Sequence, residues 1–145
     1  SGKIELFCQD LQNRFGFGLP RYQPVPQDLP LVLISPSSDK RTNATFGAST
    51  ASDGLEVLEI NPQDAAARNI TDSQTVRVHN DKGAVDLVAR VTDAVRPGVL
   101  YSPKGTWLRT SPTGMTVNAL LNADIRTDIE AGACYNETFC EVSVV

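Results

Sequence analysis

The stretch TVRVHNDKGAVDLVARV (residues 75–91) alternates apolar and polar residues on both sides of a short polar break. Val76 and Val78 alternate with polar or charged neighbours, and the alternation resumes at Val85 after the break NDKG. This pattern is typical of a β-hairpin with one face in the core, and we expect Gly83 to supply a positive φ angle in its turn. The hairpin favours a mainly β fold.

Further short strands are expected on both sides of this hairpin. The apolar run LVLI (31–34) does not alternate, which indicates a strand buried on both faces. Pro97–Gly98 suits a type II turn, and the strand VLY (99–101) follows it. The stretch FCEVSVV (139–145) indicates a closing strand, and SGKIELF (1–7) alternates as a short half-buried strand would.

A strand that runs into a short helix is predicted for LEVLEINPQDAAARN (55–69). Asn61 can cap the first turn, Pro62 suits the first helical position, and Asn69 tolerates the left-handed conformation that often ends a helix. Many short strands with tight turns and two short helices are typical of a small β-barrel or sandwich with helical crossovers. Periodicity leaves both architectures open.

The chain has the size of one domain, with 145 residues of which 41% are hydrophobic. Four prolines between positions 20 and 30 fix local backbone angles and remove amide donors. We therefore expect residues 1–30 to be an extended N-terminal segment with a proline-rich connector, and residues 31–145 to contain the core.

The overall charge and the hydropathy pattern argue against two classes of partner. A net charge of −4 and an isoelectric point of about 4.9 argue against a nucleic-acid surface, which usually carries a basic excess. The sequence has no apolar run of the roughly 18 to 20 residues that a membrane span needs, so we expect no membrane insertion.

Catalytic and metal-binding side chains are sparse. His79 is the single histidine, so the sequence offers no histidine base for a Ser/His/Asp or Cys/His group, and we predict no catalytic residue. Cys8, Cys134 and Cys140 form no C-x-x-C pair, which argues against a zinc or iron-sulfur site. We expect buried or half-buried free thiols, with a disulfide between the last two as the alternative.

Two polar loops carry local positive charge in this acidic chain. SPSSDKRTNATFG (35–47) has two basic residues against one aspartate, and YSPKGTWLRTSPTGMTVN (101–118) has Lys104 and Arg109 and no acidic residue. Such loops could hold a phosphate-bearing ligand between them through arginine side chains and backbone amides. The alternative is two ordinary surface loops.

Five segments of the chain together resemble one known family. SGKIELF, LVLISPSSDKRTNATFG, LEINPQDAAARNITDSQTVRVHNDKGAV, VTDAVRPGVLYSPKGTW and VNALLNADIRTDIEAGACYNETFCEVSV follow the order found in the C-terminal dinucleotide-binding domain of molybdopterin-dependent oxidoreductases. This group includes formate dehydrogenases, nitrate reductases and dimethyl sulfoxide reductase. The resemblance implies a mainly β fold, a six-stranded double-psi β-barrel over residues 31–145 with short crossover helices. RTNATF departs from the histidine-threonine pair common in the first loop.

The resemblance also implies a function. A domain of this family holds part of a molybdopterin guanine dinucleotide, while preceding catalytic domains hold the molybdenum or tungsten and any iron-sulfur cluster. We therefore expect no catalysis by the isolated chain. SGKIEL resembles a stretch well inside full-length members, so the sequence is expected to be a fragment of a larger enzyme. The alternative is a free-standing barrel subunit that assembles with a separate molybdenum or tungsten catalytic chain.

By position in the family's motifs, the resemblance implies eleven cofactor-binding residues and no metal ligand. They are Ser35, Pro36, Arg41, Asn43, Thr45, Lys104, Gly105, Trp107, Asn118, Tyr135 and Asn136. Arg41 is expected either to meet a phosphate or to brace its loop. Trp107 is expected in the core or at the pocket edge, and Asn118 as a ligand contact or a helix cap. The pair Tyr135 and Asn136 could approach the pterin.

Overall fold

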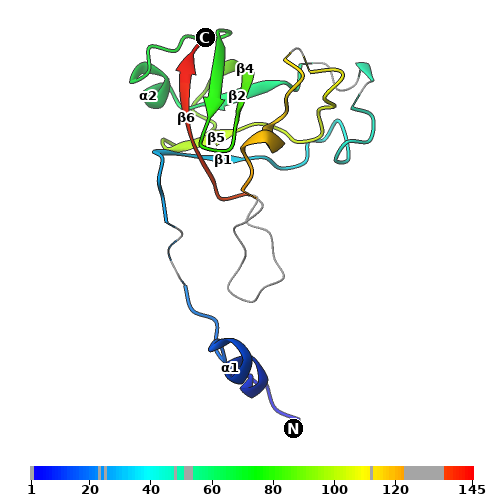
Figure 1. Cartoon of the computed structure of the whole chain (residues 1–145), viewed down its shortest axis with the longest axis vertical. Coiled ribbons are helices and arrows are strands. Elements are labelled where there is room, and N and C mark those ends of the chain that lie inside the picture. Colours follow the sequence, from blue (N-terminus) through cyan, green and yellow to red (C-terminus); the bar gives the residue numbers. More distant parts are fainter. Residues whose placement is uncertain are drawn as a thin grey trace.

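A closed barrel of six strands forms the centre of the protein (Figure 1). The computed structural model describes residues 2–22, 24, 26–47, 49–50, 54–111, 113–122 and 136–145. Within these residues the strands are β1 (Leu31–Ile34), β2 (Val57–Ile60), β3 (Thr75–His79), β4 (Ala84–Val91), β5 (Val99–Tyr101) and β6 (Thr138–Val144). Their order around the barrel is β1-β5-β2-β4-β3-β6. The mainly β, six-stranded double-psi barrel is therefore confirmed.

The barrel combines parallel and antiparallel strand pairs. β1 pairs with β5, and β2 with β4, in parallel, while the other neighbours are antiparallel. Parallel neighbours need a crossover connection, and the one from β2 to β4 contains the short helix α2 (Pro62–Ala66) and strand β3. The predicted hairpin is confirmed as the antiparallel pair β3 and β4.

The core is the inward face of the strands. In β3, Val76 and Val78 are fully buried while the residues between and beside them are exposed or half-buried, as the alternation predicts. Burial also alternates along β1, where Leu31 and Leu33 are buried and the other two residues are half-buried. The expectation that β1 is buried on both faces was wrong, because its outer face lies outside the barrel core.

The start of α2 has the predicted cap. The side chain of Asn61 accepts a hydrogen bond from the amide of Gln63 at 2.9 Å, and its Nδ2 donates to the carbonyl of Val95 at 2.8 Å. Pro62 occupies the first turn, and Asn69 takes a φ of 56° beyond the helix. The capping residue thus also ties α2 to the segment before β5.

Two glycine-containing turns have different outcomes. Gly98 takes a φ of 81°, as a type II turn requires, and the amide of Val99 donates to the carbonyl of Arg96 at 3.2 Å. Gly83 has no positive φ, so that prediction was wrong. A Cβ atom at Gly83 would instead lie 2.7 Å from the carbonyl oxygen of Ala119. The glycine is needed for a close approach between segments.

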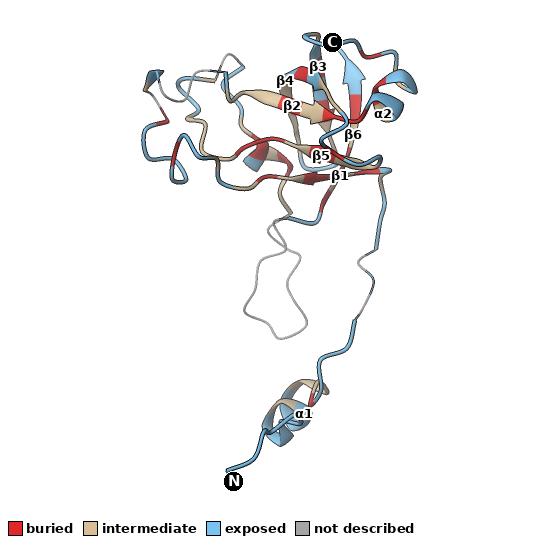
Figure 2. Cartoon of the chain, turned by 180° about the vertical axis from the view of Figure 1, so that it is seen from behind, coloured by how far each residue is buried: buried red, intermediate tan, exposed pale blue. Residues whose placement is uncertain are grey.

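The N-terminal segment lies away from the barrel (Figures 1 and 2). The strand predicted for residues 1–7 was wrong, because the described part of this segment, residues 2–7, contains no strand, and Ile4 and Leu6 are 89% and 77% exposed. A helix, α1 (Gln9–Phe15), follows without any buried residue. The division of the chain at residue 30 stays a prediction. None of the helices in the described ranges has the length and apolar character to span a bilayer.

The described cysteines are free thiols in contrasting surroundings. Cys140 is buried in β6, and this burial, with the nearby charge of Glu141, raises its pKa to about 12 against the opposing effect of Arg68. Cys8 is exposed, so the expectation of burial was wrong for it, because its segment does not pack on the barrel. Cys134, and with it the alternative of a disulfide, lies outside the described residues.

Candidate functional site

The two polar loops begin side by side at one end of the barrel. β1 and β5 are parallel neighbours, so the chain leaves both strands in the same direction. We call residues 35–47 the first loop and residues 102–116 the second loop. The amide of Lys104 donates to the carbonyl of Pro36 at 3.0 Å, which extends the strand pairing into the loops. Closure of the barrel thus brings together segments about 60 residues apart.

Arg41 fastens the first loop to the second. It is 3% exposed, its Nε donates to the carbonyl of Lys104 at 2.9 Å, and its Nη2 donates to Oγ1 of Thr106 at 3.0 Å. That hydroxyl in turn donates to Oε1 of Glu56 at 3.3 Å. Of the two roles expected for Arg41, bracing the loop is the one that these contacts describe.

Glycine and tryptophan complete the contact between the loops. Gly105 has a φ of 105°, and a Cβ atom there would overlap the carbonyl oxygen of Asn43. Nε1 of Trp107 donates to the carbonyl of Ala44 at 2.6 Å, and a Cβ atom at Gly47 would lie 2.5 Å from the indole ring. Half-buried Trp107 therefore lies at the junction of the loops, and it does not line the cavities described next.

A short 3-10 helix, η2 (Val117–Leu120), forms a third side of the site. Nδ2 of Asn80, in the β3–β4 turn, donates to the carbonyl of Leu120 at 2.8 Å and holds η2 against the hairpin. Asn118 lies within η2 and is exposed, while Thr116 occupies the N-cap position. Asn118 is therefore not the helix cap that was the alternative.

Two neighbouring cavities open between these segments. The first, of about 280 Å³, is lined by residues that include Asn43, Glu56, Asp86, Lys104, Gly105 and Asn118. The second, of about 240 Å³, is lined by residues that include Leu33, Ser35, Lys104, Val117, Asn118 and Thr138. Lys104 and Asn118 line both. The structure thus brings five of the eleven predicted residues to one pair of cavities.

Two carboxylates in the first cavity were missed from the sequence. Asp86 pairs across the hairpin with Arg77, whose Nε and Nη2 donate to its two oxygens at 2.7 and 2.8 Å. These hydrogen bonds hold the pKa of Asp86 below its usual value, against a smaller opposing effect of burial. Glu56 precedes β2 and reaches the site only because the barrel closes. No pattern among its neighbours in the sequence therefore indicates that it belongs to the site. The register of the predicted hairpin could have suggested the Asp86 pair.

The remaining predicted residues lie elsewhere. Pro36 is half-buried and Thr45 is exposed, and neither lines the two cavities. Asn136 lines a different cavity, of about 570 Å³, with Val32 and other residues on the outer side of β1. Tyr135 lies outside the described residues.

The first loop also contains buried polar atoms that the described part of the chain leaves without a partner. These are Oγ of Ser35 and Nη1 of Arg41, and both side chains are more than nine-tenths buried. Buried polar atoms in folded proteins are nearly always hydrogen-bonded, so such atoms indicate a missing water, ion or ligand. Ser35 lines the second cavity, which makes that cavity the nearest place for a partner.

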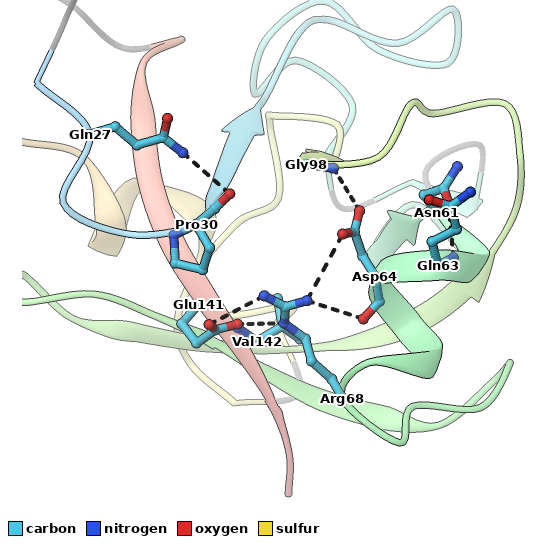
Figure 3. Close-up of polar contacts among 9 residues, drawn as sticks. All are labelled: Gln27, Pro30, Asn61, Gln63, Asp64, Arg68, Gly98, Glu141 and Val142. Carbon is cyan, nitrogen blue, oxygen red and sulfur yellow. Dashed lines mark hydrogen bonds and ion pairs between the residues drawn. The ribbon is translucent and has the colours of Figure 1, made fainter.

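A second charged cluster, beside α2, contrasts with these loops (Figure 3). Nε of Arg68 donates to Oε1 of Glu141 at 2.5 Å, and Nη1 lies 4.0 Å from Oδ1 of Asp64. The amide of Gly98 donates to Oδ2 of Asp64 at 2.7 Å. Burial raises the pKa of Glu141, but the hydrogen bonds from Arg68 and the amide of Val142, with the nearby positive charges, lower it overall. This cluster joins α2 to β6.

Comparison of the sequence with known proteins identifies relatives over most of its length. Residues 31–139 match the family model described as "Molydopterin dinucleotide binding domain". The probable oxidoreductase YoaE of Bacillus subtilis (strain 168) is 33% identical over 140 residues, which are 93% of this chain and 20% of that protein. The dimethyl sulfoxide/trimethylamine N-oxide reductase of Rhodobacter capsulatus is 39% identical over 100 residues, which are 61% of this chain and 12% of that protein. The chain thus spans a fifth or less of either relative.

A solved structure has the same fold. Acetylene hydratase from Pelobacter acetylenicus superposes with a TM-score of 0.72 over 99% of this chain and 24% of that chain, at 18% sequence identity. At this level of identity the likeness concerns the fold.

Proposed function

The chain belongs to the family of molybdopterin dinucleotide-binding domains, and we propose that its two loops and η2 form one wall of a cleft for molybdopterin guanine dinucleotide. Its relatives include a probable oxidoreductase and a reductase, which supports a place in a larger molybdopterin oxidoreductase. In this proposal, preceding catalytic domains hold the molybdenum or tungsten and any iron-sulfur cluster. The bound cofactor supplies the redox chemistry, and this chain, inactive alone, supplies placement.

The observation that carries the proposal is the pair of buried polar atoms without partners, Oγ of Ser35 and Nη1 of Arg41. Both lie in the first loop, where the family resemblance expects the cofactor. An unpaired buried donor costs about 1 to 3 kcal/mol, so a fold keeps one mainly where a ligand or ordered water completes it. The hydroxyl of Ser35 can donate to or accept from a ligand in the second cavity.

The size of the cavities supports contact with only part of a dinucleotide. Their volumes, about 280 and 240 Å³, lie below the roughly 300 to 1,000 Å³ of a pocket that encloses a drug-sized ligand. A dinucleotide is larger than such a ligand. The rest of the cofactor would therefore contact other domains.

The residues that line the cavities have distinct proposed roles. Lys104 and Asn118 line both cavities, so they are placed to offer a charged donor and an amide to the phosphates. Asn43 adds a side-chain amide, and Gly105, which has no Cβ atom, lets the second loop approach the backbone of the first loop closely. The charge of Arg41, which is buried between the two loops, makes the electrostatic potential at the loops more positive.

Five of the predicted residues have supporting or still open roles. Pro36, Thr45 and Trp107 shape the loops that carry the contacts. Asn136 stays predicted to approach the pterin from outside the two cavities, together with Tyr135.

Calorimetric titration with anaerobically extracted cofactor, and with GDP as a simpler probe, tests the proposal. Asn118→Ala and Ser35→Ala should each weaken binding by about five- to tenfold, since each removes a hydrogen bond to the ligand. Asn13→Ala, in exposed α1, is the matched control and should bind as the unchanged chain does. Equal affinity in all four proteins would refute the site.

A further inference from the structure

The first cavity is lined by the carboxylate of Glu56, which has the wrong charge to bind a phosphate. We propose that Glu56 accepts hydrogen bonds from a 2-amino-4-oxo edge of a heterocycle, the edge that guanine and pterin rings share. This inference rests on the proposed function. Such an edge presents two adjacent N–H donors, one on the ring nitrogen and one on the exocyclic amine. A carboxylate presents two acceptor oxygens and can receive both.

Glu56 has acceptor capacity left for a ligand. It is half-buried and lines the first cavity, and Oγ1 of Thr106 is the one side-chain donor to it among the described residues, at 3.3 Å. Thr106 accepts in turn from Arg41, so the negative charge of Glu56 is coupled to a buried positive charge through one hydroxyl. The network fixes one carboxylate oxygen and leaves lone pairs on both.

Asp86, the other carboxylate in this cavity, has less of this capacity. Both of its oxygens accept from Arg77, at 2.7 and 2.8 Å, so its charge is paired and each oxygen has one donor already. Oε2 of Glu56 accepts no hydrogen bond from a described side chain. Glu56 is therefore the acidic group in the first cavity with the greater capacity to accept a pair of donors.

The charge of Glu56 also restricts which part of a dinucleotide can approach it. A carboxylate repels phosphate oxygens, so the phosphates are expected beside Lys104 and Asn118, which line both cavities. The group that approaches Glu56 must then offer donors. Within the proposed ligand, the guanine and the pterin present a pair of adjacent N–H donors, whereas the ribose presents hydroxyl groups.

Two matched pairs of probes test the inference, with binding followed by NMR titration of the whole chain at neutral pH. GDP differs from IDP by the 2-amino group, and lumazine has a carbonyl oxygen in place of the 2-amino group of pterin. The unchanged chain should bind GDP over IDP, or pterin over lumazine, by about tenfold, because the analogue leaves an acceptor of Glu56 unpaired. Glu56→Gln should reduce this preference several-fold. Glu59→Gln, on β2 and paired with Arg90, is the control and should keep it.

The outcomes separate the possible sources of the edge. A Glu56-dependent preference within the GDP pair assigns the contact to guanine, and one within the pterin pair assigns it to the pterin. If the probes bind but neither preference appears, or if Glu56→Gln keeps the preference, the role of Glu56 is wrong while the proposed function stands. If none of the four probes binds, both fail.

Discussion

The first loop and α2 lie on opposite sides of the barrel (Figures 1 and 2). Arg41, in the first loop, and Arg68, just after α2, are both largely buried, but their partners differ. Arg68 contacts two carboxylates, those of Glu141 and Asp64. Arg41 donates to a carbonyl and a hydroxyl, and its Nη1 has no partner among the described residues. The first arrangement neutralises the charge within the chain, whereas the second leaves a positive charge and a donor unmatched.

This difference separates a stabilising cluster from a binding site. A buried charge that is paired and hydrogen-bonded strengthens the contact between the elements that carry it, here α2 and β6. A buried charge without a carboxylate contact lowers stability, and such a cost is expected where a ligand completes the arrangement. Variants at the two arginines, and at glycines near each, can break or sharpen the contrast.

Arg68→Met should have the largest effect on stability. It leaves the half-buried Glu141 without its partner, which we expect to lower the free energy of unfolding by about 2 to 4 kcal/mol in urea titrations. Arg90→Met, which removes an exposed partner of Glu59, is the control and should cost less than about 1 kcal/mol. Similar losses in the two variants would mean that the cluster beside α2 is no stronger than a surface ion pair.

Gly105→Ala, in the second loop, should lower the free energy of unfolding by a comparable or slightly smaller amount. The left-handed φ and the overlap with the Asn43 carbonyl together predict a loss of about 2 to 3 kcal/mol and loss of GDP binding. Gly98→Ala has the same kind of backbone angle in open space, so it should cost only about 1 kcal/mol and keep binding. Urea unfolding and calorimetry measure both. Normal GDP binding by Gly105→Ala would show that the junction of the loops does not shape the site.

Arg41→Met should change stability less than Arg68→Met or Gly105→Ala, by about 1 kcal/mol. The substitution removes two hydrogen bonds but leaves neutral acceptors, and it also removes a buried charge. GDP affinity should nevertheless fall, while Arg68→Met at the other side keeps it. The contrast fails if Arg41→Met unfolds as readily as Arg68→Met or binds GDP normally.

At acidic pH, the difference in free energy of unfolding between the unchanged chain and Arg68→Met should become smaller. The folded-state pKa of Glu141 is lowered overall, although burial opposes this, so its contribution to stability is present above the unfolded pKa of about 4.3. That contribution is lost as the pH falls through the lower folded-state value. Urea unfolding between neutral and acidic pH should therefore show the stability gap narrowing. A gap independent of pH would remove the ion pair as its cause.

Local signals in the sequence were enough for the hairpin and for α2. The alternation around Val76 places one face of β3 in the core, and Asn61 followed by proline marks where the helix begins. Gly98 was also predictable from its neighbours, because a type II turn needs a positive φ that glycine adopts without strain. These features depend on neighbours within a few residues, so a single sequence is enough to predict them.

Other features depend on contacts across the barrel. Glu56 reaches the cavity, and Asn80 reaches η2, because strands distant in sequence become neighbours, and no short pattern records that. Gly83 was assigned to a turn angle, but its role is a close approach to a helix 36 residues later. The strand expected for residues 1–7 failed because alternation over so few residues does not supply a pairing partner.

NMR chemical-shift mapping with GDP tests most directly the claim that the two sides of the barrel have different roles. We expect changes at the amides of Asn43, Lys104, Gly105 and Asn118, with the amides of Arg68 and Glu141 unchanged. Changes centred on Arg68 and Glu141, or none at the two loops at saturating GDP, would contradict it.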